Sequence, residues 1–240
     1  MTGLHDARFD VPDDFLLSVI IPVYNERQTV SELLERVRAV DIPKEIILVD
    51  DDSDDGTWEI LTEEAKRDGT RLFRHKQNLG KGGAVRTGLQ QVRGDIVLIQ
   101  DADLEYDPRD YPTLLRPIVE GRARAVYGSR FLGEHKAMLF WHAVGNKALT
   151  LVTNMLYDST LTDMETCYKV FTRSIADGLN IQQRRWGIDP EITAKILRQG
   201  VRIYEVPIAY NGREMWEGKK ISWRDGFVVL WTLLRYRVAR

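Results

Sequence analysis

The sequence predicts an α/β protein with a mostly parallel sheet flanked by helices, and two observations indicate this class. Apolar runs of strand length alternate with amphipathic segments of helical length, a pattern typical of βαβ units with right-handed crossovers. The chain has 240 residues, of which 43% are hydrophobic, enough for one large domain with a sizeable core.

The first strand and helix show the pattern most clearly. The run LLSVIIPVY at 16–24 is continuously apolar, as expected for a strand that helices cover on both faces. Thr29 or Ser31 can cap the helix that follows. Its apolar positions share one stripe, formed by Val30, Leu33, Leu34 and Val37. The alternation continues with strands predicted at 45–50, 70–75 and 95–100, and helices predicted at 58–67, 81–92 and 111–119.

The rhythm changes after a strand predicted at 124–129. Two amphipathic helices are expected at 137–157 and 222–238, and another helix at 189–199. The segment 201–210 alternates as an exposed strand does, and its Pro207 suits an edge position.

The composition restricts location and partners. The 34 Lys and Arg residues nearly balance the 36 Asp and Glu residues, so nothing recommends nucleic acid as a partner. Cys167 is the only cysteine, which favours a reducing compartment. The polar N-terminus lacks the features of a secretory signal, and no apolar run approaches the roughly 20 residues of a membrane span. We therefore expect a cytoplasmic protein.

In the stretch DIVLIQDADLEYDP, an apolar strand is followed directly by three carboxylates, those of Asp101, Asp103 and Glu105. In an extended segment, residues i and i+2 point the same way, so Asp101 and Asp103 can share one cation. Hard oxygen ligands suit Mg²⁺ or Mn²⁺, which also take phosphate oxygens. A D-x-D pair alone is common in solvated turns, but its place at a strand end favours a metal site.

Two further strand ends carry polar residues, at 22–26 and 50–53. Ligands of open α/β sheets bind at the carboxyl ends of strands, so these segments are expected to share one crevice with Asp101 and Asp103.

The glycine-rich segment NLGKGGA at 78–84 leads into a predicted helix. It fits either a phosphate-binding helix N-terminus or a tight turn that lets the helix pack against the sheet. Lys81 and Arg86 are candidate donors to the nucleotide in the first interpretation.

Several motifs, in order along the chain, resemble glycosyltransferase family 2, and in particular its polyprenyl-phosphate sugar synthases. They are LSVIIPVYNE, ILVDDDSDDGT, NLGKGGAVRTG, DADLEYDP, YGSRF and LTDMETCYKVF, spread over nearly the whole chain. The resemblance implies a GT-A-like fold and an inverting, metal-dependent sugar transfer from a nucleotide diphosphate sugar. We expect a polar extension at 1–15, the transferase domain at 16–212 and a basic amphipathic segment at 213–240.

The resemblance also implies roles for individual residues. Pro22, Tyr24 and Glu26 would frame the nucleotide, and Asp51 would read its base. Asp101 and Asp103 would hold the metal, with Ala102 against the ribose, and Arg130 would handle phosphate near the reacting centre. Two departures stand out: Asp52 replaces a glycine, and METCYKVF differs from the form found in mannose synthases.

The acceptor stays open at this level. A polyprenyl phosphate needs only cations to hold it, and the candidates are Arg130, Arg213, Lys219 and Lys220. A hydroxyl acceptor needs a carboxylate base, for which Asp189 or Glu191 is available. Both also fit an ordinary helix N-terminus. Asp163 and Glu165 are either acceptor-side residues or ordinary loop acids.

The helices at 137–157 and 222–238 are also open to two interpretations. Such aromatic, apolar helices are usually core or oligomer contacts. With basic residues at the rim of the second, they also suit peripheral contact with the inner face of the cell membrane. We expect transfer to a polyprenyl phosphate, with a hydroxyl acceptor or a non-catalytic nucleotide-sugar binder as alternatives.

Overall fold

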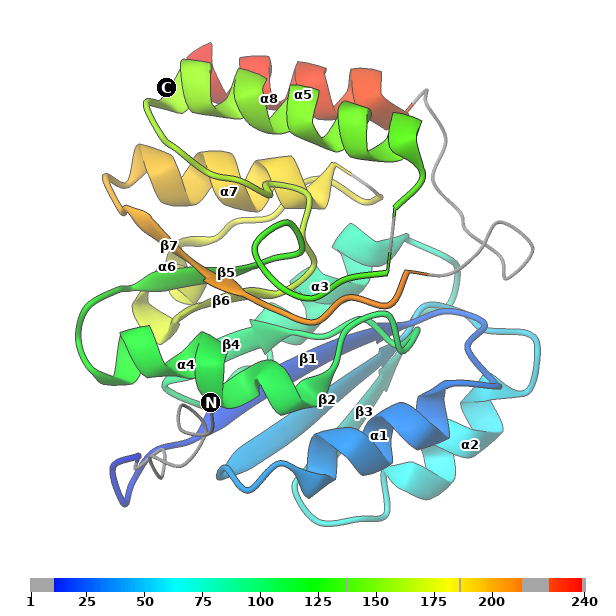
Figure 1. Cartoon of the computed structure of the whole chain (residues 1–240). Helices are drawn as coiled ribbons and strands as arrows, with labels where there is room; N and C mark the ends of the chain where they lie inside the picture. The colour runs from blue at the N-terminus through cyan, green and yellow to red at the C-terminus, as the bar shows by residue number, and fades with distance from the viewer. Residues whose placement is uncertain (1–10, 137, 186, 213–224, 239–240) are drawn as a thin grey trace.

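A seven-stranded sheet in the order β3-β2-β1-β4-β6-β5-β7 organises the molecule (Figure 1). The computed structural model describes residues 11–136, 138–185, 187–212 and 225–238. The strands are β1 (Leu17–Val23), β2 (Lys44–Asp50), β3 (Thr70–Arg74), β4 (Ile96–Ile99), β5 (Ala125–Ser129), β6 (Lys169–Thr172) and β7 (Ile203–Pro207). All pairings are parallel except those of β6, which runs antiparallel to β4 and β5. The predicted α/β class with a GT-A-like sheet is confirmed.

Helices follow the strands in the order that the sequence indicates. They are α1 (Val30–Ala39), α2 (Thr57–Glu64), α3 (Lys81–Leu89), the 3-10 helix η1 (Pro108–Asp110), α4 (Tyr111–Val119), α5 (Phe140–Tyr157), α6 (Arg173–Gly178), α7 (Ile188–Arg198) and α8 (Asp225–Val238). Thr29 occupies the N-cap position of α1, but its side chain does not cap the helix. The prediction of a side-chain cap by Thr29 or Ser31 is therefore wrong, because the Thr29 hydroxyl bonds elsewhere.

Two apolar layers sandwich the sheet. On one face, α1, α2 and α4 pack against alternate residues of β1, β2 and β4, and the predicted stripe of α1 is fully buried. On the other face, α3, α6 and α7 cover the remaining strand residues. Burying each Val, Leu or Ile stabilises the fold by about 1.5–3 kcal/mol. The continuous apolar strands thus mark a sheet covered on both sides.

Helices α5 and α8 form an outer layer above α7 (Figure 1). A small third core lies beneath them and consists of Leu161, Met164, Val229 and Leu233. Among the described helices, none is both long and apolar enough to cross a bilayer.

The short strand β6 is the main feature that the sequence did not predict. Its four residues, KVFT, are too few to show a period, and they include Lys169. Because β6 runs antiparallel, its preceding loop lies at the carboxyl ends of β1, β4 and β5. This topology brings residues 161–168 to the same edge of the sheet as Asp101. At the far side of the sheet, β7 is an edge strand, as predicted, but it spans Ile203–Pro207 rather than the predicted 201–210.

Candidate active site

The loops after β1 and β4 are joined by Thr29. Its hydroxyl donates to the Glu26 carboxylate at 2.8 Å and lies 2.8 Å from the carbonyl oxygen of Ala102. The backbone N–H of Glu26 donates to Thr57 at the start of α2. Tyr24 projects from this edge with 37% of its surface exposed, and Pro22 lies near the end of β1. The residues predicted to frame the nucleotide therefore lie together with the loop after β4 at the carboxyl ends of the strands.

Asp51 holds the glycine-rich loop in place. Its two carboxylate oxygens accept the backbone N–H groups of Leu79 at 2.8 Å and Gly80 at 2.6 Å, and His75 Nδ1 lies 2.6 Å away. Asp51 itself is buried. The residue that the family resemblance assigns to base reading is thus also the anchor of the neighbouring loop.

Asp52, where the family usually has glycine, adopts a left-handed backbone with φ of 67°. This conformation favours glycine, and aspartate is among the residues that tolerate it. Asp52 therefore holds a backbone conformation that a glycine at this position would also adopt.

The glycine-rich loop packs against the segment that leads into α7. The Gly83 N–H donates to the carbonyl of Arg184, and a Cβ at Gly80 or Gly82 would collide with the backbone of residues 183–184. The glycines at 80 and 82 thus allow close packing, but against the segment before α7 and not against the sheet as the second interpretation expected. The first residue of the helix, Lys81, reaches Asp101 with its side chain, whereas Arg86 lies half-buried in the last turn of α3.

Lys81 pairs with the first carboxylate of the D-x-D motif. Its Nζ lies 2.7 Å from Asp101 Oδ1 and 2.8 Å from Cys167 Sγ. Although burial opposes it, the Asp101 carboxylate holds the pKa of Lys81 well above its usual range. The positive charge that neutralises Asp101 in the structure is thus supplied by the chain itself.

The acidic segment after β4 is a turn. The strand ends at Ile99, Leu104 has a φ of 63°, and the backbone N–H of Glu105 donates to Asp103 Oδ1 at 3.1 Å. The expectation that Asp101 and Asp103 lie in an extended segment is therefore wrong, whereas their sharing of one cation stays a prediction. The turn instead places three carboxylates within five residues at the crevice.

The donor set of this turn fits a hard divalent cation. Mg²⁺ is commonly held by one or two carboxylates together with substrate phosphate oxygens. Among the described residues, no cluster of three or more His, Cys, Asp and Glu side chains is arranged to hold an ion unaided. A cation at Asp101 and Asp103 would thus need oxygens from the nucleotide.

Arg130 and Asp163 form a buried bidentate pair. The guanidinium donates to both carboxylate oxygens, at 2.7 and 2.8 Å, and the Arg130 backbone N–H adds a third bond at 3.0 Å. Asp163 is fully buried, and Glu205 fixes its loop by accepting from the N–H groups of Thr162 and Asp163. The two residues belong to one rigid unit at the crevice wall.

The two candidate bases on α7 are engaged inside the protein. Asp189 lies 2.6 Å from the Nζ of fully buried Lys169. Glu191 accepts from the backbone of Gln182 and Gln183, from Lys195 at 2.6 Å and from the Tyr236 hydroxyl at 2.6 Å. Both lie in the first turn of α7, and Glu191 ties α7 to α8.

Glu165 is a half-buried acid near the same cluster. Its Oε1 is buried and has no hydrogen-bond partner among the described residues. Burial and, next, the Asp189 charge raise the pKa of Glu165 from 4.5 to about 8. Glu165 is therefore largely protonated at neutral pH.

Sequence reasoning missed a buried polar network under the crevice. Gln100 accepts from Tyr111 at 2.9 Å and from Tyr168 at 2.7 Å, and Tyr210 donates to Glu105 at 2.9 Å. Sequence reasoning also missed the pair of Lys169 and Asp189. Lys169 stands inside the run YKVF, and a lysine in such a run indicates a buried charge that needs a partner. Arg213, Lys219 and Lys220, predicted to hold the acceptor, lie outside the described residues.

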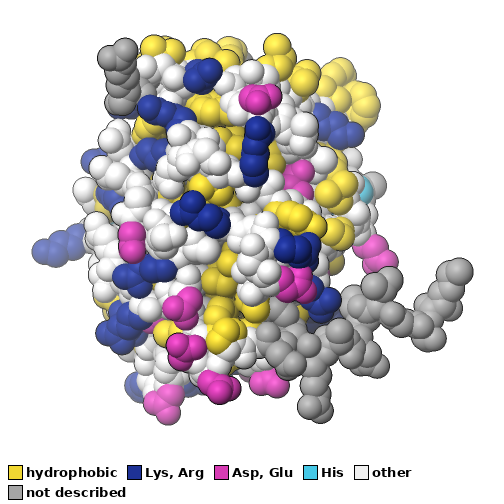
Figure 2. Space-filling model, turned by 90° about the vertical axis from the view of Figure 1, so that its left-hand side faces the viewer, with side chains coloured by type: hydrophobic (Ala, Val, Ile, Leu, Met, Phe, Trp, Pro, Cys, Tyr) yellow, Lys and Arg dark blue, Asp and Glu magenta, His cyan; other side chains and the backbone are white. Residues whose placement is uncertain are grey.

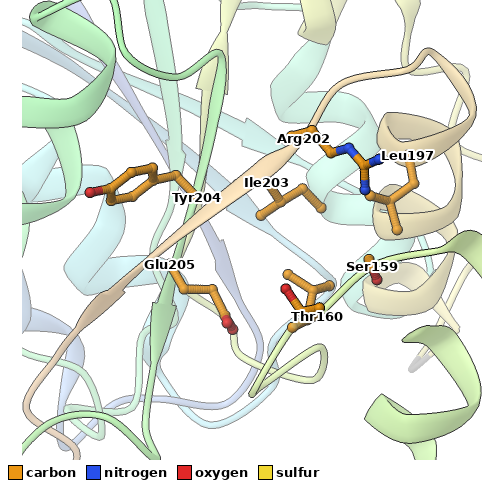
Figure 3. A pocket seen from close by; sticks show the side chains of 8 residues that line it. Ser159, Thr160, Leu197, Arg202, Ile203, Tyr204 and Glu205 are labelled. Carbon is orange, nitrogen blue, oxygen red and sulfur yellow. The ribbon is translucent and has the colours of Figure 1, made fainter. Parts of the chain in front are cut away.

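A separate cavity of about 240 Å³ lies at the β7 edge. Figure 3 shows Ile203 and Glu205 of β7 opposite Ser159 and Thr160, whereas Tyr204 points away. Glu205 is shared between this cavity and the loop of Asp163, so the cavity lies behind the crevice wall.

The chain belongs to glycosyltransferase family 2, since the family profile described as Glycosyl transferase family 2 matches residues 18–179, more than half of its length. It is a glycosyltransferase. Among its relatives, the UDP-N-acetylglucosamine–dolichyl-phosphate N-acetylglucosaminyltransferase of Methanococcus voltae is 30% identical over 95% of this chain and 98% of that protein. The dolichol-phosphate mannosyltransferase of Pyrococcus furiosus is 29% identical over 85% of this chain, which spans 58% of that protein.

Solved structures share the fold at lower identity. Glucosyl-3-phosphoglycerate synthase from Mycobacterium tuberculosis, in complex with Mn²⁺ and UDP-glucose, aligns with a TM-score of 0.72 at 17% identity. The alignment covers 93% of this chain and 79% of that one. This likeness supports the GT-A-like architecture.

Proposed function

We propose that the chain transfers a sugar from a nucleotide diphosphate sugar to a polyprenyl phosphate at a membrane surface. The observation that carries the proposal is an apolar surface next to the crevice. The chain leaves β5 at the edge of the sheet that holds Asp101, and the next described helix along the chain is α5. A lipid held on α5 can therefore present its phosphate to the crevice.

The outer apolar face of α5 and α8 is the membrane-contact surface in this proposal. Ten large hydrophobic side chains are exposed there: Phe140, Trp141, Val144, Leu151, Met155, Phe227, Val228, Trp231, Leu234 and Val238. Figure 2 shows hydrophobic side chains along the upper edge of the molecule, where these helices lie. Aromatic and aliphatic residues beside basic ones suit an interfacial helix. The M. voltae and P. furiosus relatives are named for reactions with dolichyl phosphate or dolichol phosphate. These names support a lipid acceptor.

The donor side rests on the crevice loops. Tyr24, Glu26 and the Asp51 loop would frame the nucleotide, and Asp101 and Asp103 would hold Mg²⁺ or Mn²⁺ with the diphosphate. A bound cation supplies Lewis-acid stabilisation of the leaving diphosphate. The complex of the mycobacterial fold relative with Mn²⁺ and UDP-glucose supports this assignment.

The chain's own residues would orient the acceptor. A phosphate oxygen would attack the anomeric carbon from the face opposite the diphosphate, forming one C–O bond as the other breaks, which inverts the configuration. An anionic nucleophile needs no general base, which suits a crevice whose Asp189 and Glu191 are committed to internal contacts. Lys81, which pairs with Asp101, and Arg130, which pairs with Asp163, are the described cations that we assign to this role.

The donor half of the proposal is tested by thermal unfolding with UDP or GDP, with and without Mn²⁺. Ligands that bind only the folded state raise the melting temperature. We expect the increase from nucleotide to depend on Mn²⁺, and the Asp103→Asn variant to lose that dependence and metal-dependent turnover. Asp68→Asn removes an equal charge from an exposed loop before β3, at the opposite edge of the sheet, and should behave as wild type. A normal Mn²⁺ response in Asp103→Asn would show that the cation is held elsewhere.

A further inference from the structure

A basic hollow of about 460 Å³ lies where the C-terminal ends of α7 and α8 meet the segment after α6. Of the described residues that line it, three are cationic, Lys195, Arg198 and Arg235, and none is acidic. Its volume lies within the range of ordinary small-molecule sites, about 300–1,000 Å³.

Two of the three cations have no carboxylate partner among the described residues. Lys195 pairs with the buried Glu191 at 2.6 Å. Arg198 donates at 2.8 Å to the backbone carbonyl of Tyr236, and Arg235 donates to the neutral Gln182 amide at 3.4 Å. Neither arginine has a carboxylate partner in the part of the chain that the structure describes, and both are exposed. Guanidinium groups match phosphate oxygens through paired N–H donors, so the hollow suits a phosphate group.

The hollow lies at the depth where lipid phosphates would be. Its Arg235 is in the last turn of α8, next to Leu234 of the exposed apolar face, and Arg198 is one helix layer below, on α7. Packed helix axes are about 8–10 Å apart, and interfacial helices sink ~5–10 Å into the boundary between headgroups and acyl chains. Figure 2 shows Lys and Arg side chains on the face directly below the hydrophobic upper edge.

We propose that this hollow binds the phosphate group of an anionic phospholipid and fixes how the enzyme lies on the membrane. The inference rests on the membrane contact in the proposed function and adds a second, polar point of attachment. The hollow is separate from the transfer site, because Asp189 and Arg198 are at opposite ends of α7, about 13 Å apart along the helix. Together, the outer apolar face of α5 and α8 and this polar attachment would hold the transfer site in one orientation toward the lipid acceptor.

The test is the binding of the full chain to vesicles of phosphatidylcholine, with and without phosphatidylglycerol, in the absence of donor and acceptor. The variants are Arg198→Gln, Arg235→Gln and the double variant. Arg237→Gln is the matched control, since Arg237 is in the same last turn of α8 but does not line the hollow. Lys195 stays unchanged because its removal would leave Glu191 buried without a cation.

An arginine near an anionic surface changes the partition roughly fivefold. We expect the double variant to lose roughly tenfold or more of its partition onto anionic vesicles, with binding to neutral vesicles unchanged. Arg198→Gln should lose more than Arg237→Gln, although Arg198 is further from the apolar face. An equal or smaller loss in Arg198→Gln, with an unchanged melting temperature, would overturn the inference, because general surface charge would explain the binding.

A second measurement separates lipid phosphate from soluble phosphate. Calorimetric titration with inorganic phosphate should give weak binding at most. Binding that requires Arg198 and Arg235, together with normal vesicle binding in the double variant, would overturn the lipid assignment and make the hollow a site for soluble phosphate. Because the vesicle assay contains no substrates, failure of the transfer reaction leaves its result unaffected. Absence of any vesicle binding by the wild type would remove both the membrane contact and this site.

Discussion

At the scale of single residues, the buried pair of Arg130 and Asp163 contributes to the stability of the fold. Because Asp163 is fully buried, the Arg130→Ala variant leaves its charge without a cation. Removing one partner of such a pair costs about 3–5 kcal/mol. We expect that loss in the free energy of unfolding, measured with denaturant. Arg109→Ala, which breaks the pair between exposed Arg109 and Asp107, should leave the free energy of unfolding close to the wild-type value. Similar losses in the two variants would mean that Asp163 is hydrated or neutral.

The raised pKa of Glu165 predicts that the stability of the fold falls as the pH rises. The folded protein raises its pKa from 4.5 to about 8, so the folded state binds a proton that the unfolded state has released. The resulting stability is fully present below pH 4.5 and is lost as the pH rises toward about 8. The Glu165→Gln variant should lose less stability than the wild type over this window. Glu59→Gln, on the exposed side of α2, should keep the wild-type slope, and an identical slope in Glu165→Gln would contradict the burial argument.

Sequence reasoning located residues but not their partners. The acids after β4 were found because a strand pattern ends where they begin. The pairing of Lys81 with Asp101, twenty positions along the chain, depends on how α3 packs and leaves no local signal. The same holds for Glu165, whose pKa is raised first by burial and then by the charge of Asp189 on α7. The roles assigned to the crevice residues remain predictions.

At the scale of elements, the glycine-rich loop is shaped by contact with the segment before α7. A Cβ at Gly82 would collide with the carbonyl of Gln183, so the Gly82→Ala variant must displace one of the two segments. We expect a loss of about 1–3 kcal/mol in the free energy of unfolding, typical of overpacking. Gly145→Ala in α5 meets open space and should instead stabilise the protein by about 0.5–1 kcal/mol. Equal effects would show that the loop has room to adjust.

Elements with a long, regular pattern were predicted well. Strand β1 and helices α1 and α4 lie where the apolar periods place them. Strand β6 was missed because four residues cannot display a period, and its antiparallel course depends on tertiary context. The loop before β6 could be assigned to the site only through its family resemblance.

At the scale of the whole molecule, α8 has two apolar sides with different environments. Val229 and Leu233 are buried against Leu161 and Met164, whereas Trp231 is 65% exposed. Ending the chain at Ile221 should therefore lower the free energy of unfolding by several kcal/mol, on the order of 3–6 for the two buried side chains. Trp231→Ser should change stability by less than about 0.5 kcal/mol and weaken vesicle binding.

The matched control for Trp231 is Tyr204→Ser, which removes an exposed aromatic from β7, away from the outer apolar face of α5 and α8. It should leave vesicle binding unchanged. If both variants bind vesicles equally, the outer face has another occupant, such as a second copy of the chain. The amphipathic pattern of the sequence could not distinguish membrane contact from contact with another protein surface, because both require the same exposed apolar side of the helix.

The most direct test of the central claim is a transfer assay with the purified chain, Mn²⁺ or Mg²⁺, and a panel of radiolabelled UDP- and GDP-sugars, with polyprenyl phosphate present or absent. We predict chloroform-soluble label that appears only when the lipid and a divalent cation are both present, which would also identify the donor. Label that stays in the aqueous phase and attaches to an added glycan would contradict the account and make the acceptor a hydroxyl.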